Sequence, residues 1–524
     1  MTAPAPWTAR ARACASPSPS WRERARRAPV IFRAPRRAKP DSVIFRHYPG
    51  RAAMNEISRR GAMALAGGAA VSAMVAARAC AQGNGAAQDG PAFVRDDIGA
   101  LRHVLVHSPV MDDYMIERES GGLVPNLNSH WPEFVAQHGH LTRLLRETGA
   151  EVLELADALQ GAIDAARASG RFEAWLSGVH PRLSGDADAV SAATLLGRDP
   201  ARQYRLRDIG GYRHDVSDSS STMWTRDASF MTPNGLVVCN SLSPRRLREN
   251  MTLRFALMHA PQLADYPVAF DAVAEGVILE GGDAQMVDRN TLFLGVGQRS
   301  DPRAAPLLAR RLNMDVLAIH VHQTEYLTRN QPSMGGGAVA GLRVLFLHLD
   351  TFFTHVADRH VLCVPWFLEH AHAGEDPLSE YIRGARTETT ISDSDASTAL
   401  DFLKEIGKVT LYRAGTGAKE ELEDMKLVDY VRARGYRVTH VGGRAPDAGQ
   451  EGFSAFMRDT LGEMRRQASN VVATAPGQVL AYDGSPLTEA ALERDGVAVT
   501  TFPARELWAN YGGPHCLTMP LRRD

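Results

Sequence analysis

The chain has 524 residues, of which 44% are hydrophobic and 23% are charged, as in an ordinary globular protein. This length allows a large core and more than one domain. The formal net charge is −1, so the bulk charge gives no indication of binding to nucleic acid or to a membrane surface.

Residues 1–53 are rich in Arg, Pro and Ser and contain few large apolar side chains. Such a segment cannot bury enough apolar surface to form a packed core. We interpret it as an over-extended start or a disordered basic segment, with Met54 as the true start. A genuine basic arm is the alternative interpretation.

Residues 54–81 have the pattern of a secretory signal peptide. The paired arginines Arg59 and Arg60 precede an apolar stretch of small residues and a small-x-small cleavage site that ends at Ala81. The paired arginines favour the twin-arginine export machinery as a partner, and hence a periplasmic or secreted protein. The apolar stretch is too short for a stable membrane span, so we expect none in the mature form. A lipoprotein modified at Cys80 is the alternative.

A Gly- and Ala-rich linker at 82–91 precedes an α/β pattern over 92–524, which we interpret as one catalytic domain. Residues of about 156–205 have helical character with polar breaks and are expected to form a helical insertion. The predicted strands are 101–107, 152–155, 235–239, 277–279, 291–295, 344–349, 360–364, 409–412, 436–441, 471–475 and 477–482. The predicted helices outside the insertion are 130–148, 304–312 and 397–406.

The cysteines of the predicted mature chain have different surroundings. Cys239 and Cys363 lie in apolar, strand-like runs and are expected to be buried core residues. Cys516 follows a Gly-Gly-Pro turn near the end of the chain, where it is a candidate nucleophile. Because the chain contains no C-x-x-C pair, we expect no metal site of that type.

Three polar motifs accompany Cys516, and each lies beside a strand-like run. They are Trp224-Thr225-Arg226-Asp227, Glu280-Gly281-Gly282-Asp283 and His348-Leu349-Asp350-Thr351. Singly, each has an ordinary structural explanation: a surface ion pair, a turn cap or a core histidine. Together with Cys516 they supply a nucleophile, a proton shuttle and several carboxylates. That set suits attack on a cationic, planar carbon.

These motifs resemble those of arginine deiminases, members of the guanidino-group modifying (amidinotransferase) superfamily. The resemblance spans Val94–Leu521. It also includes Asp96–Pro109, Asn470–Gly477 and Gly512–Cys516. It implies an α/β fold of the pentein type, a five-bladed α/β propeller with the site at its centre and a helical insertion. It implies no metal and no organic cofactor.

The resemblance also implies a mechanism. Asp227 and Glu280 would bind the guanidinium group of a small-molecule substrate, and Asp350 would hold its remaining nitrogens. Cys516 would attack the guanidinium carbon, and His348 would protonate the departing ammonia. His348 would then activate the water that hydrolyses the thiouronium intermediate. The expected reaction converts L-arginine to L-citrulline and ammonia, a step of arginine catabolism.

The resemblance to the family is weaker for the residues expected to bind the end of the substrate away from the guanidinium group. The residues that we assign there are Arg299, Arg246, Ser221, Asn470 and Tyr511. In the family, groups at this end bind the α-carboxylate and the α-amine of the substrate. Arg299 and Arg246 match two such arginines, with Arg245 as a near alternative to Arg246. Ser221 stands where the family commonly has asparagine, and Tyr511 where it commonly has arginine.

The sequence therefore leaves the substrate open. Another guanidino compound or a peptide arginine is an alternative to L-arginine. Amidino transfer to an amine is an alternative reaction, and a non-catalytic guanidino-binding protein is an alternative class. A homo-oligomer is compatible with the sequence.

Overall fold

The computed structural model describes residues 93–110, 115–117, 123–125, 130–181, 183–196, 222–241, 246–297, 299–321, 347–369, 376–388, 392–445, 447, 449–510 and 512–524. They all belong to Gly83–Asp524, the second of two units into which the chain divides. The predictions for 1–53, 54–81 and 82–91 lie outside the described residues, as do Ser221 and Tyr511. Within the described ranges, no helix is long and apolar enough to cross a membrane.

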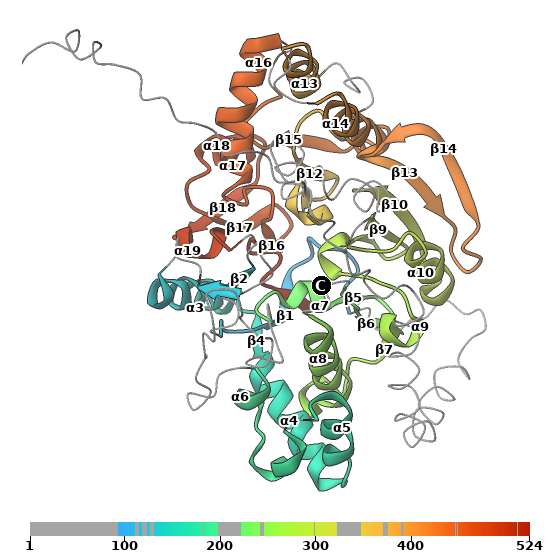
Figure 1. Ribbon diagram of the computed structural model, residues 1–524, viewed down its shortest axis with the longest axis vertical. Coiled ribbons are helices and arrows are strands. Elements are labelled where there is room, and N and C mark those ends of the chain that lie inside the picture. Colours follow the sequence, from blue (N-terminus) through green and yellow to red (C-terminus); the bar gives the residue numbers. More distant parts are fainter. Residues whose placement is uncertain are drawn as a thin grey trace, which may run out of the picture. The chain divides into compact units, whose positions relative to one another are not determined.

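The described part of the chain has an α/β fold in which five sheets share one pattern. In each sheet the first strand pairs antiparallel with the second, and the second pairs parallel with the third. The strands can be followed by their labels in Figure 1. The five sheets are β19 (Met519–Arg523), β1 (Leu101–Val106) and β4 (Glu151–Glu154); β5 (Ser229–Thr232), β6 (Gly235–Val238) and β7 (Val268–Asp271); β8 (Ala284–Asp288), β9 (Thr291–Val296) and β10 (Asp315–His320); β11 (Phe353–Ala357), β12 (His360–Cys363) and β15 (Arg437–His440); and β16 (Val472–Ala475), β17 (Gln478–Tyr482) and β18 (Ala498–Phe502).

Two further pairs of strands complete this picture. β13 (Lys408–Tyr412) and β14 (Lys419–Lys426) extend the third sheet beyond β10. β2 (Met115–Glu117) and β3 (Leu123–Pro125) form a separate antiparallel pair.

Helices connect the second strand of a sheet to the third, since two parallel neighbours need a crossover connection. In four sheets these helices are α3 (Trp131–Glu147), α8 (Leu247–His259), α10 (Ala304–Leu312) and α18 (Pro486–Arg494). Helix α10 shows how the sequence specifies such an element. Its small and apolar residues recur at helical spacing and are buried, and the left-handed residue Asn313 (φ 52°) ends it.

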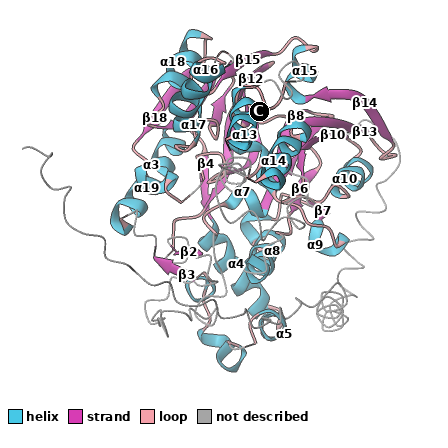
Figure 2. Ribbon diagram, turned by 45° about the horizontal axis from the view of Figure 1, so that its top comes forward, coloured by secondary structure: helices cyan, strands magenta, loops and turns pink. Residues whose placement is uncertain are grey.

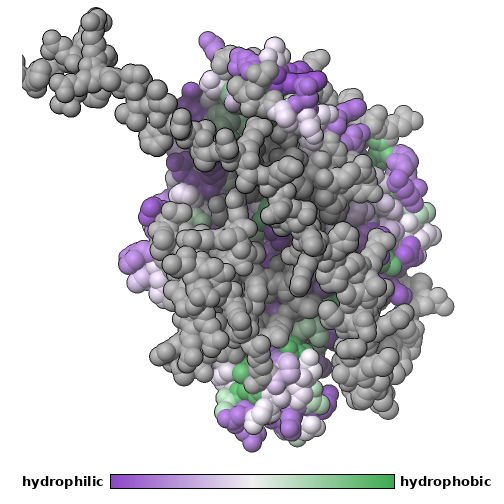
Figure 3. Space-filling model, viewed as in Figure 1, coloured by the Kyte–Doolittle hydropathy of each residue, from purple (hydrophilic) through white to green (hydrophobic). Residues whose placement is uncertain are grey.

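Further helical elements lie in the connections between strands. They are α4 (Leu155–Ala168), α5 (Phe172–Val179), η2 (Ser184–Ala189), α6 (Ala192–Leu195), η4 (Pro261–Leu263), α9 (Ala272–Glu275), α13 (Pro377–Thr387), α14 (Asp393–Glu405), α15 (Leu427–Arg432), α16 (Gly449–Ala455), η8 (Phe456–Thr460), α17 (Leu461–Met464) and α19 (Arg505–Trp508). Figure 2 shows α4, α5 and α8 grouped together, in agreement with the contacts among them. In the surface view of Figure 3 this group carries both hydrophilic and hydrophobic side chains.

Successive sheets contact one another. β19 contacts β5, α10 contacts β7, β8 contacts β11, β11 contacts β16, and β16 contacts β1. The first sheet therefore neighbours both the second and the fifth. Since β19 is the last strand of the chain and β1 the first of the five sheets, their pairing joins the two ends of the described chain.

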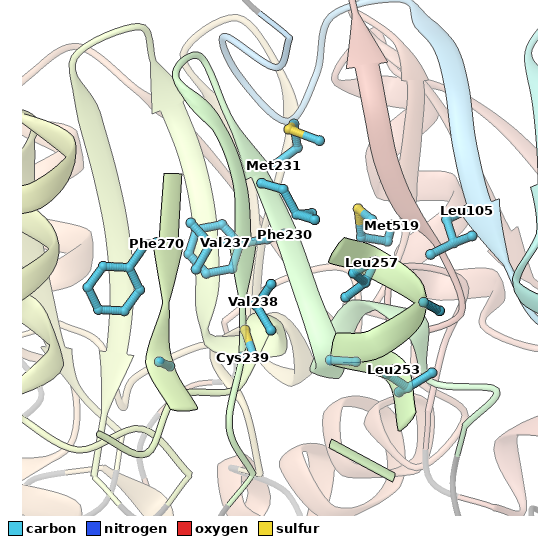
Figure 4. Packing of buried hydrophobic residues seen from close by; sticks show 14 of the residues in the cluster. Leu105, Phe230, Met231, Val237, Val238, Cys239, Leu253, Leu257, Phe270 and Met519 are labelled. Atoms are coloured by element: carbon cyan, nitrogen blue, oxygen red, sulfur yellow. The ribbon is translucent and has the colours of Figure 1, made fainter. Parts of the chain in front are cut away.

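The apolar core lies between the sheets and the helices. Figure 4 shows part of a cluster that contains Phe230 and Val238 of the second sheet, Leu257 of α8 and Met519 of β19. Cys239 belongs to the same cluster and is buried, as predicted. Burial, followed by nearby carboxylates, raises the pKa of its thiol well above the ordinary value, so it is an inert core residue.

Most of the predicted strands coincide with observed ones, but two do not. The predicted strand 277–279 is wrong, because Leu279 forms only an isolated bridge to Asn240 before the chain turns. Of the predicted strand 344–349, only 347–349 is described, and the chain there enters a 3₁₀ turn at Leu349. Both segments end in the polar turns that the site uses.

The side chain of Arg523 links the first and fifth sheets, and its replacement tests this contact. Its Nη1 donates to the carbonyls of Gly99 (2.7 Å) and Ala473 (2.9 Å), and its side chain is buried. We expect Arg523→Ala to lower the free energy of unfolding by at least about 2 kcal/mol, because two carbonyls lose a charged donor. Chemical denaturation measures this change.

The neighbouring Arg522 is exposed on the same strand and is the matched control. Arg522→Ala should change the free energy of unfolding by less than about 0.5 kcal/mol. Equal effects of the two substitutions would contradict the assignment of Arg523.

Candidate active site

Five polar residues precede the first strands of the five sheets. Asp227 comes shortly before β5, Glu280 before β8, Asp350 before β11, Asn470 before β16 and Cys516 before β19. All five side chains are buried. Because the five sheets share one topology, five equivalent turns deliver one residue each. The structure thereby brings together residues that are far apart in the sequence.

Short helical turns and glycines allow these segments to approach closely. The turns are α7 (Thr225–Ala228), η5 (Gly281–Asp283) and η6 (Leu349–Thr351). A Cβ atom on Gly282 would lie 2.7 Å from Nδ1 of His348, and one on Gly281 would lie 2.0 Å from the carbonyl oxygen of Arg226. Glycine is therefore required at both positions.

Cys516 is held by Asn470 and Asp350. The backbone N–H of Cys516 donates to Oδ1 of Asn470 (3.1 Å), and Nδ2 of Asn470 donates to Sγ of Cys516 (3.2 Å). The thiol in turn donates to Oδ2 of Asp350 (3.3 Å). Burial, followed by the charges of Asp350 and Asp227, raises the pKa of Cys516 well above its ordinary value. The sulfur is therefore a neutral thiol at neutral pH.

His348 lies against two carboxylates. Its Nε2 donates to Oε2 of Glu280 (2.8 Å), and its Nδ1 is 3.7 Å from Oδ1 of Asp227. Burial opposes the charge of the imidazolium, but Asp227, Glu280 and Asp283 outweigh it and raise the pKa of His348 to about 9. His348 is therefore protonated at neutral pH and can act as an acid.

Glu280 is occupied by protein groups. Its two oxygens accept hydrogen bonds from Ser241, His348 and Arg299. Burial would raise the pKa of Glu280, but Arg299, His348 and Arg246 lower it overall. Glu280 is thus a hydrogen-bond partner of His348. Its role as a ligand of the substrate stays a prediction.

Asp227 keeps one oxygen available. Its Oδ2 accepts a hydrogen bond from Nη1 of Arg246 (2.9 Å), and Arg246 is itself held by Glu249 (Nη2 to Oε1, 2.6 Å). Its Oδ1 is buried and has no hydrogen-bond partner among the described residues. A buried carboxylate oxygen without a donor is costly, and it is a natural place for a ligand N–H.

Asp350 repeats this arrangement. Its Oδ2 accepts from Nδ1 of His515 (2.8 Å) as well as from Cys516. Its Oδ1 is buried and lacks a hydrogen-bond partner within the described ranges. Burial would raise the pKa of Asp350, but the hydrogen bond from His515 lowers it overall, so the group is ionised.

The two arginines expected at the far end of the substrate are arranged differently from each other. Arg246 is buried and its guanidinium group contacts Asp227, Glu249 and, at 3.7 Å, Glu280. Arg299 is partly exposed, and its Nη1 lies 3.4 Å from Glu280. In this arrangement Arg246 holds carboxylates of the protein, so a role toward a substrate carboxylate stays a prediction for both residues.

The structure places three further residues in the site, to which the sequence motifs assigned no role. Glu249 holds Arg246, and the i,i+3 spacing on a helix was an available signal. Asp283 accepts from Ser300 (2.7 Å) and from the backbone N–H of Leu349 (3.0 Å), and so joins two of the turns. His515 contacts Asp350, and only its position beside Cys516 pointed to it.

Atoms of Asp227, Glu280 and His348 lie within 4.8 Å of one another, the spacing of a metal site. Two features oppose a metal ion there. A metal ligand must be neutral imidazole, whereas His348 has a raised pKa, and the guanidinium of Arg246 already lies beside both carboxylates. The donor set therefore fits an organic cation better than a metal ion.

Sequence comparisons point to one family. Residues 187–329 and 455–523 match the family model described as arginine deiminase. The arginine deiminase of Rhodococcus opacus (strain B4) is 25% identical, over 84% of this chain and 99% of that protein. That of Metamycoplasma arthritidis (strain 158L3-1) is 26% identical, over 82% of this chain and 96% of that protein. Over most of its length the chain is therefore similar to arginine deiminases.

The solved structures that match this chain have low sequence identity to it. Unliganded AgrE has a TM-score of 0.41 and 15% identity, and the match covers 80% of this chain and 40% of that chain. The N-terminal domain of ArgZ bound to product, an arginine dihydrolase from Cyanobacteria, has a TM-score of 0.41 and 14% identity. That match covers 82% of this chain and 98% of that chain.

The protonation of His348 is directly testable. We expect Glu280→Gln to lower the pKa of His348 from about 9 by at least about one unit, because the imidazolium loses a charged acceptor. A histidine-selective NMR titration measures this pKa. The control is Glu275→Gln, which removes a carboxylate that pairs with Arg311 elsewhere in the chain. An unchanged pKa in Glu280→Gln would contradict the assigned cause.

Proposed function

We propose that the protein hydrolyses L-arginine to L-citrulline and ammonia through a covalent thiouronium intermediate on Cys516. One observation carries this proposal: Asp227 and Asp350 each keep a buried carboxylate oxygen without a hydrogen-bond partner among the described residues. The nucleophile candidate Cys516 and the acid candidate His348 adjoin these carboxylates. The arginine deiminases among the relatives support arginine as the substrate.

Two free carboxylate oxygens suit a guanidinium cation. The group is planar and carries N–H donors on several sides, so it can donate to Oδ1 of Asp227 and to Oδ1 of Asp350. Both side chains are nearly excluded from water, which strengthens each charged hydrogen bond. The same interactions offset the cost of the two unpaired oxygens.

Substrate binding also activates the nucleophile. The thiol of Cys516 is held neutral by burial and by the charges of Asp350 and Asp227. A bound cation beside the sulfur favours the thiolate, and the thiol proton is released to solvent. The thiolate then forms a bond to the guanidinium carbon.

His348 completes both half-reactions. As an imidazolium it donates a proton to the departing amine, which leaves as ammonia. The neutral imidazole then removes a proton from a water molecule that attacks the thiouronium carbon. The C–S bond breaks, the remaining hydroxyl proton passes to the sulfur, and the neutral ureido product leaves with Cys516 again a thiol and His348 again protonated. Glu280 stabilises the charged state of His348 through their hydrogen bond.

We further propose that the five sheets form the five-bladed propeller of pentein-type proteins, with the site at its centre. The repeated strand pattern supports this arrangement, and so do the contacts from each sheet to the next. It accounts for five polar turns that converge on one site.

The nucleophile is the first target for mutation. Cys516→Ala should abolish production of citrulline and ammonia from L-arginine, because Cys516 supplies the sulfur of the thiouronium. Asp350→Asn should retain the fold but raise KM at least about tenfold, since a neutral amide replaces the charged acceptor. The control Cys363→Ala alters a buried thiol of the core and should retain turnover.

The assay uses protein that begins at Gln82 and compares L-arginine, agmatine and an arginine-containing peptide. Citrulline production by Cys516→Ala would refute the mechanism. Product from agmatine or the peptide alone would retain the chemistry and change the substrate. A guanidinylated product after addition of an amine would indicate amidino transfer instead of hydrolysis.

We also propose that residues 54–81 direct export by the twin-arginine route, which places the mature protein in the periplasm or outside the cell. The paired arginines Arg59 and Arg60 support this proposal. Replacement of both by lysine (R59K and R60K) should leave an uncleaved precursor inside the cell. Cell fractionation and the mass of the mature chain test this outcome, and export of the double variant would contradict it.

A further inference from the structure

His515 directly precedes the candidate nucleophile and contacts the neighbouring carboxylate. Its Nδ1 lies 2.8 Å from Oδ2 of Asp350, and both side chains are almost completely buried. The same oxygen accepts the thiol of Cys516 at 3.3 Å. Thus Oδ2 of Asp350 accepts hydrogen bonds from both the ring of His515 and the thiol of Cys516.

The surroundings determine which nitrogen of His515 carries the proton. Burial, followed by the charge of Arg226, lowers the pKa of His515, while Asp350 and Asp97 oppose that change. His515 is therefore neutral at neutral pH and has a single ring N–H. Because an ionised carboxylate can only accept, that N–H must be on Nδ1.

The hydrogen bond from His515 to Oδ2 determines the orientation of Oδ1, the second carboxylate oxygen of Asp350. A carboxylate can rotate about its Cβ–Cγ bond and exchange its two oxygens. With Oδ2 held by His515, Oδ1 is the oxygen left without a partner among the described residues. The backbone of Asp350 is held separately, because Nδ2 of Asn470 donates to its carbonyl (3.1 Å). The thiol of Cys516 also donates to Oδ2, but once the thiol loses its proton, His515 is the described donor that still orients this side chain.

We propose that His515 is a positioning residue, which fixes Asp350 through its Nδ1–H so that Oδ1 faces the substrate and Oδ2 remains beside Cys516. The substrate part of this inference rests on the proposed function, whereas the effect on the thiol does not. When the donor is removed, the negative charge on Oδ2 is shared by the thiol alone. The thiol then holds its proton more tightly and reacts more slowly.

A matched pair of variants isolates this donor. The amide nitrogen of asparagine can occupy the position of Nδ1, whereas that of glutamine reaches only toward the position of Nε2. His515→Asn should therefore keep the hydrogen bond to Asp350, and His515→Gln should lose it. Both replacements are neutral, polar and able to donate, so a merely structural role would not separate them.

The first readout needs no substrate. Iodoacetamide alkylation of Cys516 is followed at one fixed alkaline pH by mass spectrometry of the peptide that contains it. We expect the rate in His515→Gln to fall several-fold below wild type and the rate in His515→Asn to stay close to it. His355→Gln is the control, because His355 is also buried but bonds to Gln285 (2.9 Å). It should not change the alkylation rate.

The second readout is turnover of L-arginine. His515→Gln should raise KM by about tenfold to a hundredfold with a smaller change in kcat, since the bound cation loses an oriented acceptor. His515→Asn should restore KM to within a few-fold of wild type. Thermal unfolding of all variants separates these effects from a loss of folded protein.

The outcomes distinguish this inference from the proposed function. Equal alkylation rates and equal KM values in the asparagine and glutamine variants would overturn the role of His515. Absence of turnover in wild type, together with different alkylation rates in the two variants, would refute the proposed function and retain the pairing. Turnover by wild type, with equal alkylation rates and equal KM values in the two variants, would retain the proposed function and refute the role of His515.

Discussion

Hydrogen bonds to one oxygen of each of two buried carboxylates determine what this site can do. Arg246 holds Oδ2 of Asp227, and His515 holds Oδ2 of Asp350. Without these donors, either carboxylate would be free to rotate or to take up a proton in its buried surroundings. With them, one oxygen of each group is oriented and left without a partner among the described residues. The two carboxylates are thus oriented for a ligand before any ligand binds.

The sequence identified the reacting groups because their motifs are contiguous and unusual. Cys516 follows a Gly-Gly-Pro turn, and the glycines after Glu280 allow close approach to His348. The partners of these groups could not be predicted, since they come from remote segments. Asp350 and His515 are 165 positions apart, and Asn470 and Cys516 are 46 apart. Their contact depends on how the sheets meet, which no local pattern specifies.

For the fold, too, local segments could be predicted from the sequence, whereas contacts between remote segments could not. Strands with a continuous apolar run, such as 291–295, were predicted close to their observed bounds. The segment 277–279 is also apolar, yet it forms only a bridge, because the chain must turn there to deliver Glu280. The strand β19 was missed, although its pairing with β1 joins the two ends of the described chain. Local composition specifies a strand, whereas its partner depends on the rest of the fold.

The charges around the site explain why a cation is the fitting ligand. Asp227, Glu280, Asp350 and Glu249 are carboxylates of the described network, and Arg246, Arg299 and the imidazolium of His348 are its cations. When these groups are ionised, the negative charges exceed the positive ones by one, and Asp283, whose pKa burial raises to about 7, adds to that excess when it is ionised. Such an excess is costly in a buried site, and part of that cost appears as the neutral thiol of Cys516.

A guanidinium substrate would supply the missing positive charge beside the sulfur. Binding would then remove the electrostatic reason for the thiol to keep its proton, so that the nucleophile forms where and when the substrate is present. A neutral ureido product lacks this charge. Release of product would therefore return Cys516 to the thiol and leave the two carboxylate oxygens again without a partner in the described part of the chain. The same charge balance thus favours substrate over product and links binding to activation of the nucleophile.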